Sequence, residues 1–198
     1  MNAIAPAEKG AHTIRVLRYV AVAALAFQAV HLVEHLAQFG YWATHPSEAP
    51  WLTPWATQGR DVLAVGGEAS VGNELLHFLG NLIFLGGLVA LVVLCRRAGK
   101  ATGGFPSLRK ATVVQGLHVA EHVVLTTTSF AFGKAIGLST FLGLVDGPVM
   151  TSYRVWFHFL INLIATWYAG RTLMEMNAGG LITTSTSATG KTATAIGH

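Results

Sequence analysis

Four long apolar stretches constrain the fold of this chain more than any other feature. They cover about residues 17–42, 71–95, 111–132 and 153–174. The hydrocarbon core of a membrane is about 30 Å thick and is crossed by about 20 apolar residues in a helix, so each stretch is long enough to span it. Only 11% of the residues are charged, whereas a soluble domain carries about 25%. We therefore expect an all-α fold, an integral membrane four-helix bundle.

The connections between the stretches predict how the chain crosses the membrane. The connection at 96–110 is short and strongly basic, whereas 43–70 is rich in Pro, Trp and Gly and 133–152 holds few charges. Because Lys and Arg accumulate on the cytoplasmic side, we expect both termini to be cytoplasmic and the plasma (inner) membrane to hold the protein. The expected parts are a cytoplasmic N-terminal segment (1–16), a first two-helix membrane repeat (17–95), a basic cytoplasmic loop (96–110), a second two-helix membrane repeat (111–176) and a disordered tail (177–198).

A polar motif occurs twice inside these apolar stretches. The pattern Gln-x-x-His-x-x-Glu-His begins at Gln28 in the first stretch and at Gln115 in the third. The second and fourth stretches share the pattern His-Phe-x-x-Asn, which begins at His77 and at His158. The bundle is therefore expected to consist of two tandem two-helix repeats.

Helical spacing places the residues of each motif on one face, because residues i, i+3, i+4 and i+7 of an α-helix lie on the same side. An ionisable group costs at least about 2.5–3.5 kcal/mol in the hydrocarbon core and is a functional candidate there. These groups must therefore face one another, and a bound metal would neutralise them, since imidazole and carboxylate suit Fe, Zn, Mn or Cu. The predicted metal ligands are His31, Glu34, His35, Glu74, His77, His118, Glu121, His122 and His158.

Three further polar residues are predicted to serve the bound cofactor. Gln28 and Gln115 lie one turn before the first histidine of each motif. They either orient an imidazole or make hydrogen bonds between helices. Arg154 either extends to the outer interface or pairs with Glu74, in place of a charge that the second repeat lacks.

Two short strings resemble known metal-binding sequences. Glu74-Leu-Leu-His77 resembles the Glu-x-x-His element of ferritin-like di-iron carboxylate bundles, where two helices carry it. Here it occurs once, because Val155 stands at the corresponding position of the fourth stretch. The strings His31–His35 and His118–His122 resemble the His-x-x-Glu-His pentapeptide of inverzincin peptidases. The first resemblance implies a di-iron centre and the second a zinc site.

The residue inventory favours a non-haem metal centre, dinuclear and with iron preferred over zinc or copper. Glu34 and Glu121 occupy equivalent positions, so we expect them to flank or bridge two ions, or to act as catalytic bases. The expected activity is an oxidoreductase that acts on a lipophilic substrate. The alternatives are a b-type cytochrome, in which two histidines hold haem b and electrons pass to quinone, a metal-ion or proton transporter, and a packing network without a ligand.

The partners expected from the sequence follow from the same pattern. The lipid bilayer is the first, and a homo-oligomer or a partner membrane subunit is the second, because four spans are few for a transport path. The basic residues lie at the ends of apolar stretches, as membrane topology requires. No nucleic-acid motif is visible, so we expect no nucleic-acid partner.

Overall fold

The computed structural model describes residues 6–48, 51–145 and 147–181. Within these ranges the protein is helical and has no β-strand, which confirms the all-α prediction. The long helices are α1 (Pro6–Thr44), α3 (Ala69–Arg97), α4 (Pro106–Phe132) and α5 (Pro148–Ala178). The connections hold a short helix, α2 (Pro54–Leu63), and three 3-10 helices, η1 (Val65–Gly67), η2 (Thr102–Gly104) and η3 (Leu138–Gly143).

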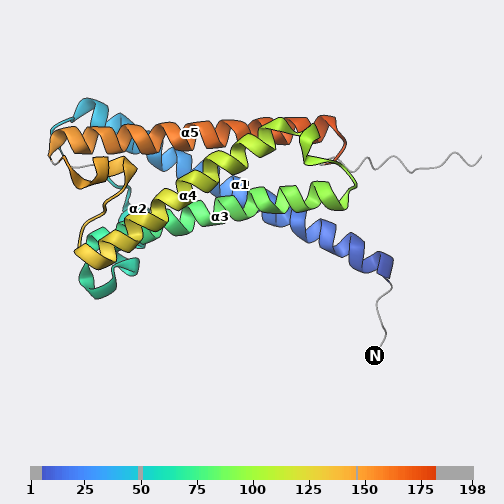
Figure 1. The fold of residues 1–198 in the computed structure, drawn as a ribbon, viewed down its shortest axis with the longest axis horizontal. Helices are drawn as coiled ribbons and strands as arrows, with labels where there is room; N and C mark the ends of the chain where they lie inside the picture. The colour runs from blue at the N-terminus through green and yellow to red at the C-terminus, as the bar shows by residue number, and fades with distance from the viewer. Residues whose placement is uncertain (1–5, 49–50, 146, 182–198) are drawn as a thin grey trace, which may run out of the picture.

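The four long helices pack side by side as a bundle (Figure 1). Helix α1 contacts α3 and α5, and α4 contacts the same two helices. The start of α1, the end of α5 and the α3–α4 connection lie at one end of the bundle, on the right in Figure 1, which we call the termini end. Helix α2 and η3 lie at the opposite end, which we call the loop end.

Proline and glycine set several helix boundaries. Helices α1, α2, α4 and α5 all begin with proline, whose fixed φ suits the first turn and whose missing N–H has no partner there anyway. Helix α4 is capped by Gly133, which has the left-handed φ of 69° that glycine adopts without a steric penalty. The four predicted stretches lie inside the four long helices, each of which extends further at one or both ends.

The connections differ from the sequence-based expectation in two places. The predicted loop at 43–70 contains α2, which the Pro-, Trp- and Gly-rich composition did not suggest. The predicted N-terminal segment is helical from Pro6 onward. Helix α5 continues to Ala178, and most of the predicted disordered tail, from residue 182, lies outside the described residues.

The interior of the bundle is divided between an apolar half and a polar half. An apolar core that includes Phe84, Leu88, Leu94 and Met176 fills the part toward the termini end. Within this half α1 and α3 approach closely at Gly87, which has no side chain. A Cβ added there would lie only 2.4 Å from the Cβ of Ala24. Polar side chains fill the part toward the loop end, so the chemistry of the molecule is confined to one half of its interior.

The outer surface of the bundle carries many large apolar side chains. Exposed side chains on the long helices include Val30, Val33, Leu82, Leu117 and Leu163. Two helices, over His12–Thr44 and Ala69–Arg97, are long and apolar enough to cross a membrane. Among the described residues α4 and α5 do not meet the same hydropathy criterion, so four membrane spans remain a prediction.

Candidate metal centre

Six histidines from all four long helices gather in the polar half of the interior. Their imidazole rings form a continuous cluster, in which the centroids of neighbouring rings lie between 4.5 and 6.3 Å apart. The sequence predicted that the two repeats would bring these residues together, and the structure does so. The members are His31 and His35 on α1, His77 on α3, His118 and His122 on α4, and His158 on α5.

Each copy of the motif places two imidazole nitrogens side by side. The Nε2 atoms of His31 and His35 are 3.1 Å apart, and those of His118 and His122 are 3.2 Å apart. In the metal-free protein such a contact is a hydrogen bond, in which one ring donates. Two nitrogens that each lie about 2.0–2.1 Å from one ion are themselves about 3–3.4 Å apart. Both pairs therefore have the spacing of two ligands of a single ion.

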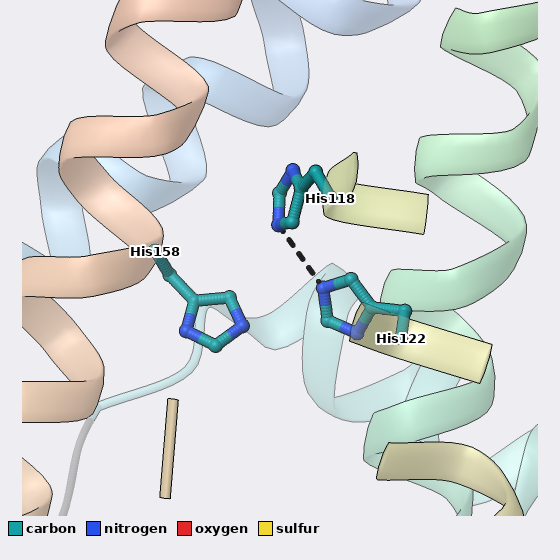
Figure 2. A group of neighbouring side chains, drawn as sticks. All are labelled: His118, His122 and His158. Carbon is teal, nitrogen blue, oxygen red and sulfur yellow. Dashed lines mark hydrogen bonds between the residues drawn. The ribbon is translucent and has the colours of Figure 1, made fainter. Parts of the chain in front are cut away.

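The second helix of each repeat adds a third histidine to each pair. The nitrogens that His118, His122 and His158 can offer all lie within 4.8 Å of one another, and Figure 2 shows the three rings directed toward a common space. In the other repeat the ring of His77 lies 5.9 Å from His31 and 5.7 Å from His35. The set from the second repeat is the more compact of the two.

Backbone carbonyls fix the orientation of two of these rings. The Nδ1 atom of His77 lies 2.8 Å from the carbonyl oxygen of Asn73, and Nδ1 of His158 lies 2.9 Å from that of Arg154. A carbonyl oxygen only accepts hydrogen bonds, so each Nδ1 carries the proton. The lone pair is left on Nε2, which is the arrangement typical of metal-binding histidines.

Gln38 plays the same part for His35, and the sequence reasoning missed it. Its Oε1 lies 3.2 Å from Nδ1 of His35, and its Nε2 donates to Oε1 of Glu34 over 3.2 Å. The second bond fixes which end of the amide is the acceptor. Gln38 stands three and four residues after these partners, on the same helix face, so the spacing was a usable signal.

Glu74 is the carboxylate that lies nearest to the histidines. One of its oxygens accepts a hydrogen bond from Arg154 across the bundle. Pairing with Glu74 was one of the two roles predicted for Arg154. The other oxygen lies 3.7 Å from Nδ1 of His122, which is too long for a hydrogen bond. Within the part of the chain that the structure describes, this oxygen and the Nδ1 atoms of His118 and His122 are buried and have no hydrogen-bond partner. Of these three atoms, the Glu74 oxygen and Nδ1 of His122 lie near each other, so Glu74 is placed to accept the Nδ1 proton of His122 when Nε2 of that ring binds a metal.

Glu34 and Glu121 are directed toward the loop end. Glu34 accepts hydrogen bonds from the backbone N–H of Thr53 at 3.1 Å and from its hydroxyl group. Glu121 accepts a hydrogen bond from the backbone N–H of Ser139 at 2.8 Å. Each motif thereby holds the loop that follows its own helix. That these carboxylates bridge two ions remains a prediction, and in the structure both oxygens of Glu34 and one oxygen of Glu121 already have loop partners.

Gln28 and Gln115 make hydrogen bonds between helices, and among the described residues neither is hydrogen-bonded to an imidazole. Nε2 of Gln28 donates to Oδ1 of Asn162 at 3.2 Å and to Oγ1 of Thr166 at 3.0 Å. Nε2 of Gln115 donates to Oδ1 of Asn81 at 2.8 Å and to its backbone oxygen at 3.0 Å. Each asparagine also donates to the carbonyl of the histidine one turn before it, at 2.9 Å. The glutamines therefore support the centre through the backbone of the neighbouring helix.

A cavity of about 440 Å³ leads from the loop end to the histidines. Its lining includes Ala69 and Ser70, which are exposed at the start of α3. It also includes His35, His77 and His158, the three rings whose Nδ1 atoms are hydrogen-bonded to oxygen. Molecules that enter at the loop end can therefore reach the side of the cluster where the ring orientations are fixed.

Comparison with known proteins gives a family and no activity. Searches among curated proteins and among solved structures found no match to the chain. A family model described as "Family of unknown function (DUF6008)" matches residues 3–185. The matched range contains all six histidines of the cluster and both repeats. Because the match covers nearly the whole length, the chain belongs to the DUF6008 family.

Proposed function

We propose that this protein is an integral-membrane metalloprotein whose six histidines hold a non-haem, dinuclear centre. The observation that carries the proposal is the pair of Nε2–Nε2 distances, 3.1 Å in the first motif and 3.2 Å in the second. Each pair is accompanied by a third imidazole from the second helix of the same repeat. One ion for each three-histidine set accounts for all six side chains.

The distribution of polarity supports a membrane location. Charged and polar side chains such as Glu74, Gln115 and His118 are buried, while valine and leucine side chains cover the outside. A water-soluble bundle would have the opposite arrangement, and a bilayer accepts this one. Arg96 and Arg97 end α3 and Lys110 lies near the start of α4, so all three flank the α3–α4 connection at the termini end. This supports a cytoplasmic location for that end in the plasma (inner) membrane.

The donors available to a metal are mainly imidazoles. Imidazole suits iron, copper, zinc and nickel alike. Iron was preferred from the sequence because of three carboxylates, but Glu34 and Glu121 are bonded to loops, which leaves Glu74. We keep a redox-active metal, iron or copper, as the proposal, and zinc as its alternative. A haem held between two histidines would have to separate rings that now lie against one another.

The proposed reaction is the oxidation of a lipophilic substrate. The two three-histidine sets would hold the redox-active ions, and these ions would supply the electron-transfer chemistry. Removal of two hydrogen atoms from a substrate releases two electrons and two protons, and a quinone dissolved in the bilayer is the class of oxidant that would take up both. The bilayer that surrounds the apolar surface is the source of both lipophilic molecules in this scheme.

The test is metal analysis combined with an optical spectrum on one detergent-purified, chelator-washed sample. We expect about two metal ions per chain, since each of the two sets supplies three nitrogen ligands. His45→Ala is a matched control, because His45 is exposed at the end of α1 and lies outside the cluster. A Soret absorption that shifts on reduction would overturn the proposal in favour of a b-type cytochrome. Absence of both metal and chromophore would leave a packing network or an ion path.

A further inference from the structure

The cavity above the histidines is lined by two arginines. Among the described residues that line it there are two arginines and three histidines, and none is acidic. We propose that this cavity binds an anionic group, a carboxylate or a similar oxyanion, and holds it against the metal centre. The inference rests on the proposed function, because it names the chemical class of the molecule that reaches that centre.

Arg60 and Arg154 provide the positive charge. They come from different elements, α2 and α5, and both line the same cavity. Their side chains are 27% and 29% exposed, so both are partly withdrawn from water. Arg60 also pairs with Asp61 at 2.8 Å, but the Asp61 side chain is 58% exposed. Because water and salt screen an exposed carboxylate, much of the Arg60 charge remains available to the cavity.

Arg154 is held in place by a buried carboxylate. Glu74, whose side chain is 2% exposed, binds one end of the guanidinium from below. A guanidinium has five N–H donors in a planar fork and can therefore bind a second carboxylate as well. Glu74 thus fixes Arg154 at the boundary between the cavity and the histidine cluster.

Neutral donors complete the polar part of the lining. Ser70, Asn73 and Thr151 also line the cavity. The floor consists of histidines whose fixed Nδ1–H groups leave Nε2 for a metal. An anionic ligand would gain attraction from the arginines and from the metal together. A free cation that entered by this route would be repelled by both, which argues against cation transport through the cavity.

The anionic group has two sources that the cavity does not distinguish. It belongs either to a small solute that enters from water at the loop end, or to the head of a lipophilic substrate whose tail remains in the bilayer. Acetate and decanoate carry the same carboxylate with different tails, so the two probes separate the sources. Acetamide has the shape of acetate without its charge and is the matched neutral probe.

The experiment measures the binding of these three probes to the full-length protein in an uncharged detergent. The readouts are the change in thermal unfolding temperature of the metal-free protein and the change in the optical spectrum of the metal-loaded protein. Arg60→Gln removes the charge, Arg60→Lys restores it, and Arg97→Gln is the control, because Arg97 is exposed at the other end of α3. Comparing variants with the wild type cancels the partition of decanoate into detergent.

We expect Arg60→Gln to raise the Kd of acetate about two- to fivefold, as for a partly exposed charge pair. Arg60→Lys should recover most of the affinity, Arg97→Gln should have no effect, and acetamide should not respond to any variant. Decanoate binding that is much tighter than acetate binding and equally dependent on Arg60 would identify a lipophilic carboxylate as the ligand. Comparable binding of the two probes would identify a small solute.

Two outcomes separate this inference from the proposed function. If the protein holds metal but acetate and decanoate bind equally well to the wild type and to Arg60→Gln, the anion site is overturned and the metal centre stands. If the wild type holds no metal but carboxylates still raise its unfolding temperature in an Arg60-dependent manner, the anion site stands and the metal proposal fails. An equal response to acetate and acetamide overturns the anion site in either form of the protein.

Discussion

The two halves of the chain build the same framework and differ in charge. Each half supplies a histidine pair with closely spaced Nε2 atoms and a third histidine whose Nδ1 is bonded to a backbone carbonyl. The halves differ four and three residues before that third histidine. The first has Asn73 and Glu74 where the second has Arg154 and Val155. The ligands are thus duplicated, while one ion pair connects the halves and exists only once.

A second difference concerns the support of the histidine pairs. Gln38 orients His35 in the first half, whereas Leu125 stands at the corresponding position of the second and belongs to the buried apolar residues. His122 of the second half instead lies beside Glu74, which comes from the first half. The comparison teaches that the two three-histidine sets are equal in ligands and unequal in surroundings, so two bound ions would differ in their properties.

The largest expected effect tests whether each half holds its own ion. Replacing His31 and His35 together by alanine, or His118 and His122 together, should each reduce the metal content to about half, because each pair supplies two of the three nitrogens of one site. The single variants His35→Ala and His122→Ala should lower it by similar amounts. Metal analysis of purified protein is the measurement, with His45→Ala as the control.

The same experiment can break the equivalence of the halves. If one double variant loses all metal and the other keeps nearly all of it, a single centre belongs to one repeat. If either single variant leaves the metal content unchanged, the two sets are not equivalent ligand sets.

The next effect in size concerns the ion pair between the halves. Arg154→Gln should cost on the order of 3 kcal/mol of unfolding free energy, because it leaves the buried Glu74 carboxylate unpaired. Glu74→Gln should cost less, because the Arg154 side chain is 29% exposed and retains access to water. The double variant Glu74→Val with Arg154→Asn makes the halves alike and should recover part of the loss. Thermal or denaturant unfolding in detergent measures the loss of stability in each variant. Equal losses for Arg154→Gln and Glu74→Gln would contradict the expectation that the unpaired carboxylate costs more.

A smaller effect concerns the close approach of α1 and α3. Gly87→Ala should destabilise the protein by about 1–3 kcal/mol, the range for an overpacked core, because the added Cβ would meet Ala24. Gly86→Ala is a matched control on the adjacent, exposed position, where nothing lies within 4 Å. It should stabilise the helix by about 0.5–1 kcal/mol. The second half has Tyr168 at the position equivalent to Gly87, so this contact belongs to the first half alone. Similar unfolding temperatures for the two variants would show that the contact is easily relaxed.

The smallest effect should be equal in the two halves. Gln28→Leu and Gln115→Leu each remove hydrogen bonds to an asparagine on a neighbouring helix. We expect each to cost about 1–2 kcal/mol of unfolding free energy, because a buried acceptor loses its donor. The costs should agree within about 0.5 kcal/mol if the repeats are equivalent here. A clearly larger loss of metal than of stability in either variant would restore the direct role in orienting an imidazole that the sequence left open.

The sequence predicted which residues share a helix face, and it did not predict which partners the connections between helices provide. The spacing of His31 and His35, and the recurrence of that spacing, predicted a shared interior face, because the period of the helix is fixed. The positions of Glu34 and Glu121 on that same stripe suggested a metal bridge. Their actual partners, Thr53 and Ser139, lie in connections whose path no periodic pattern describes.

Helix α2 also lies in one of these connections and was missed. Its start carries a usable signal, since Thr53 before Pro54 matches a common helix N-terminus, and Oγ1 of Thr53 does accept from the N–H of Ala56. The ion pair of Glu74 and Arg154 was among the predicted alternatives. The sequence could not choose between a pair and an extended arginine, because the choice depends on how far apart α3 and α5 lie.

The hydrogen bonds of the two glutamines have a consequence for the symmetry of the molecule. Gln28 of the first half reaches Asn162 of the second, and Gln115 of the second reaches Asn81 of the first. Such reciprocal contacts are those of a two-fold interface between identical subunits, here closed within one chain. In a dimer of identical two-helix units every residue appears twice, so the ion pair between Glu74 and Arg154 would also have to appear twice. A single chain escapes that constraint and can carry one acid and one base across its own pseudo-axis.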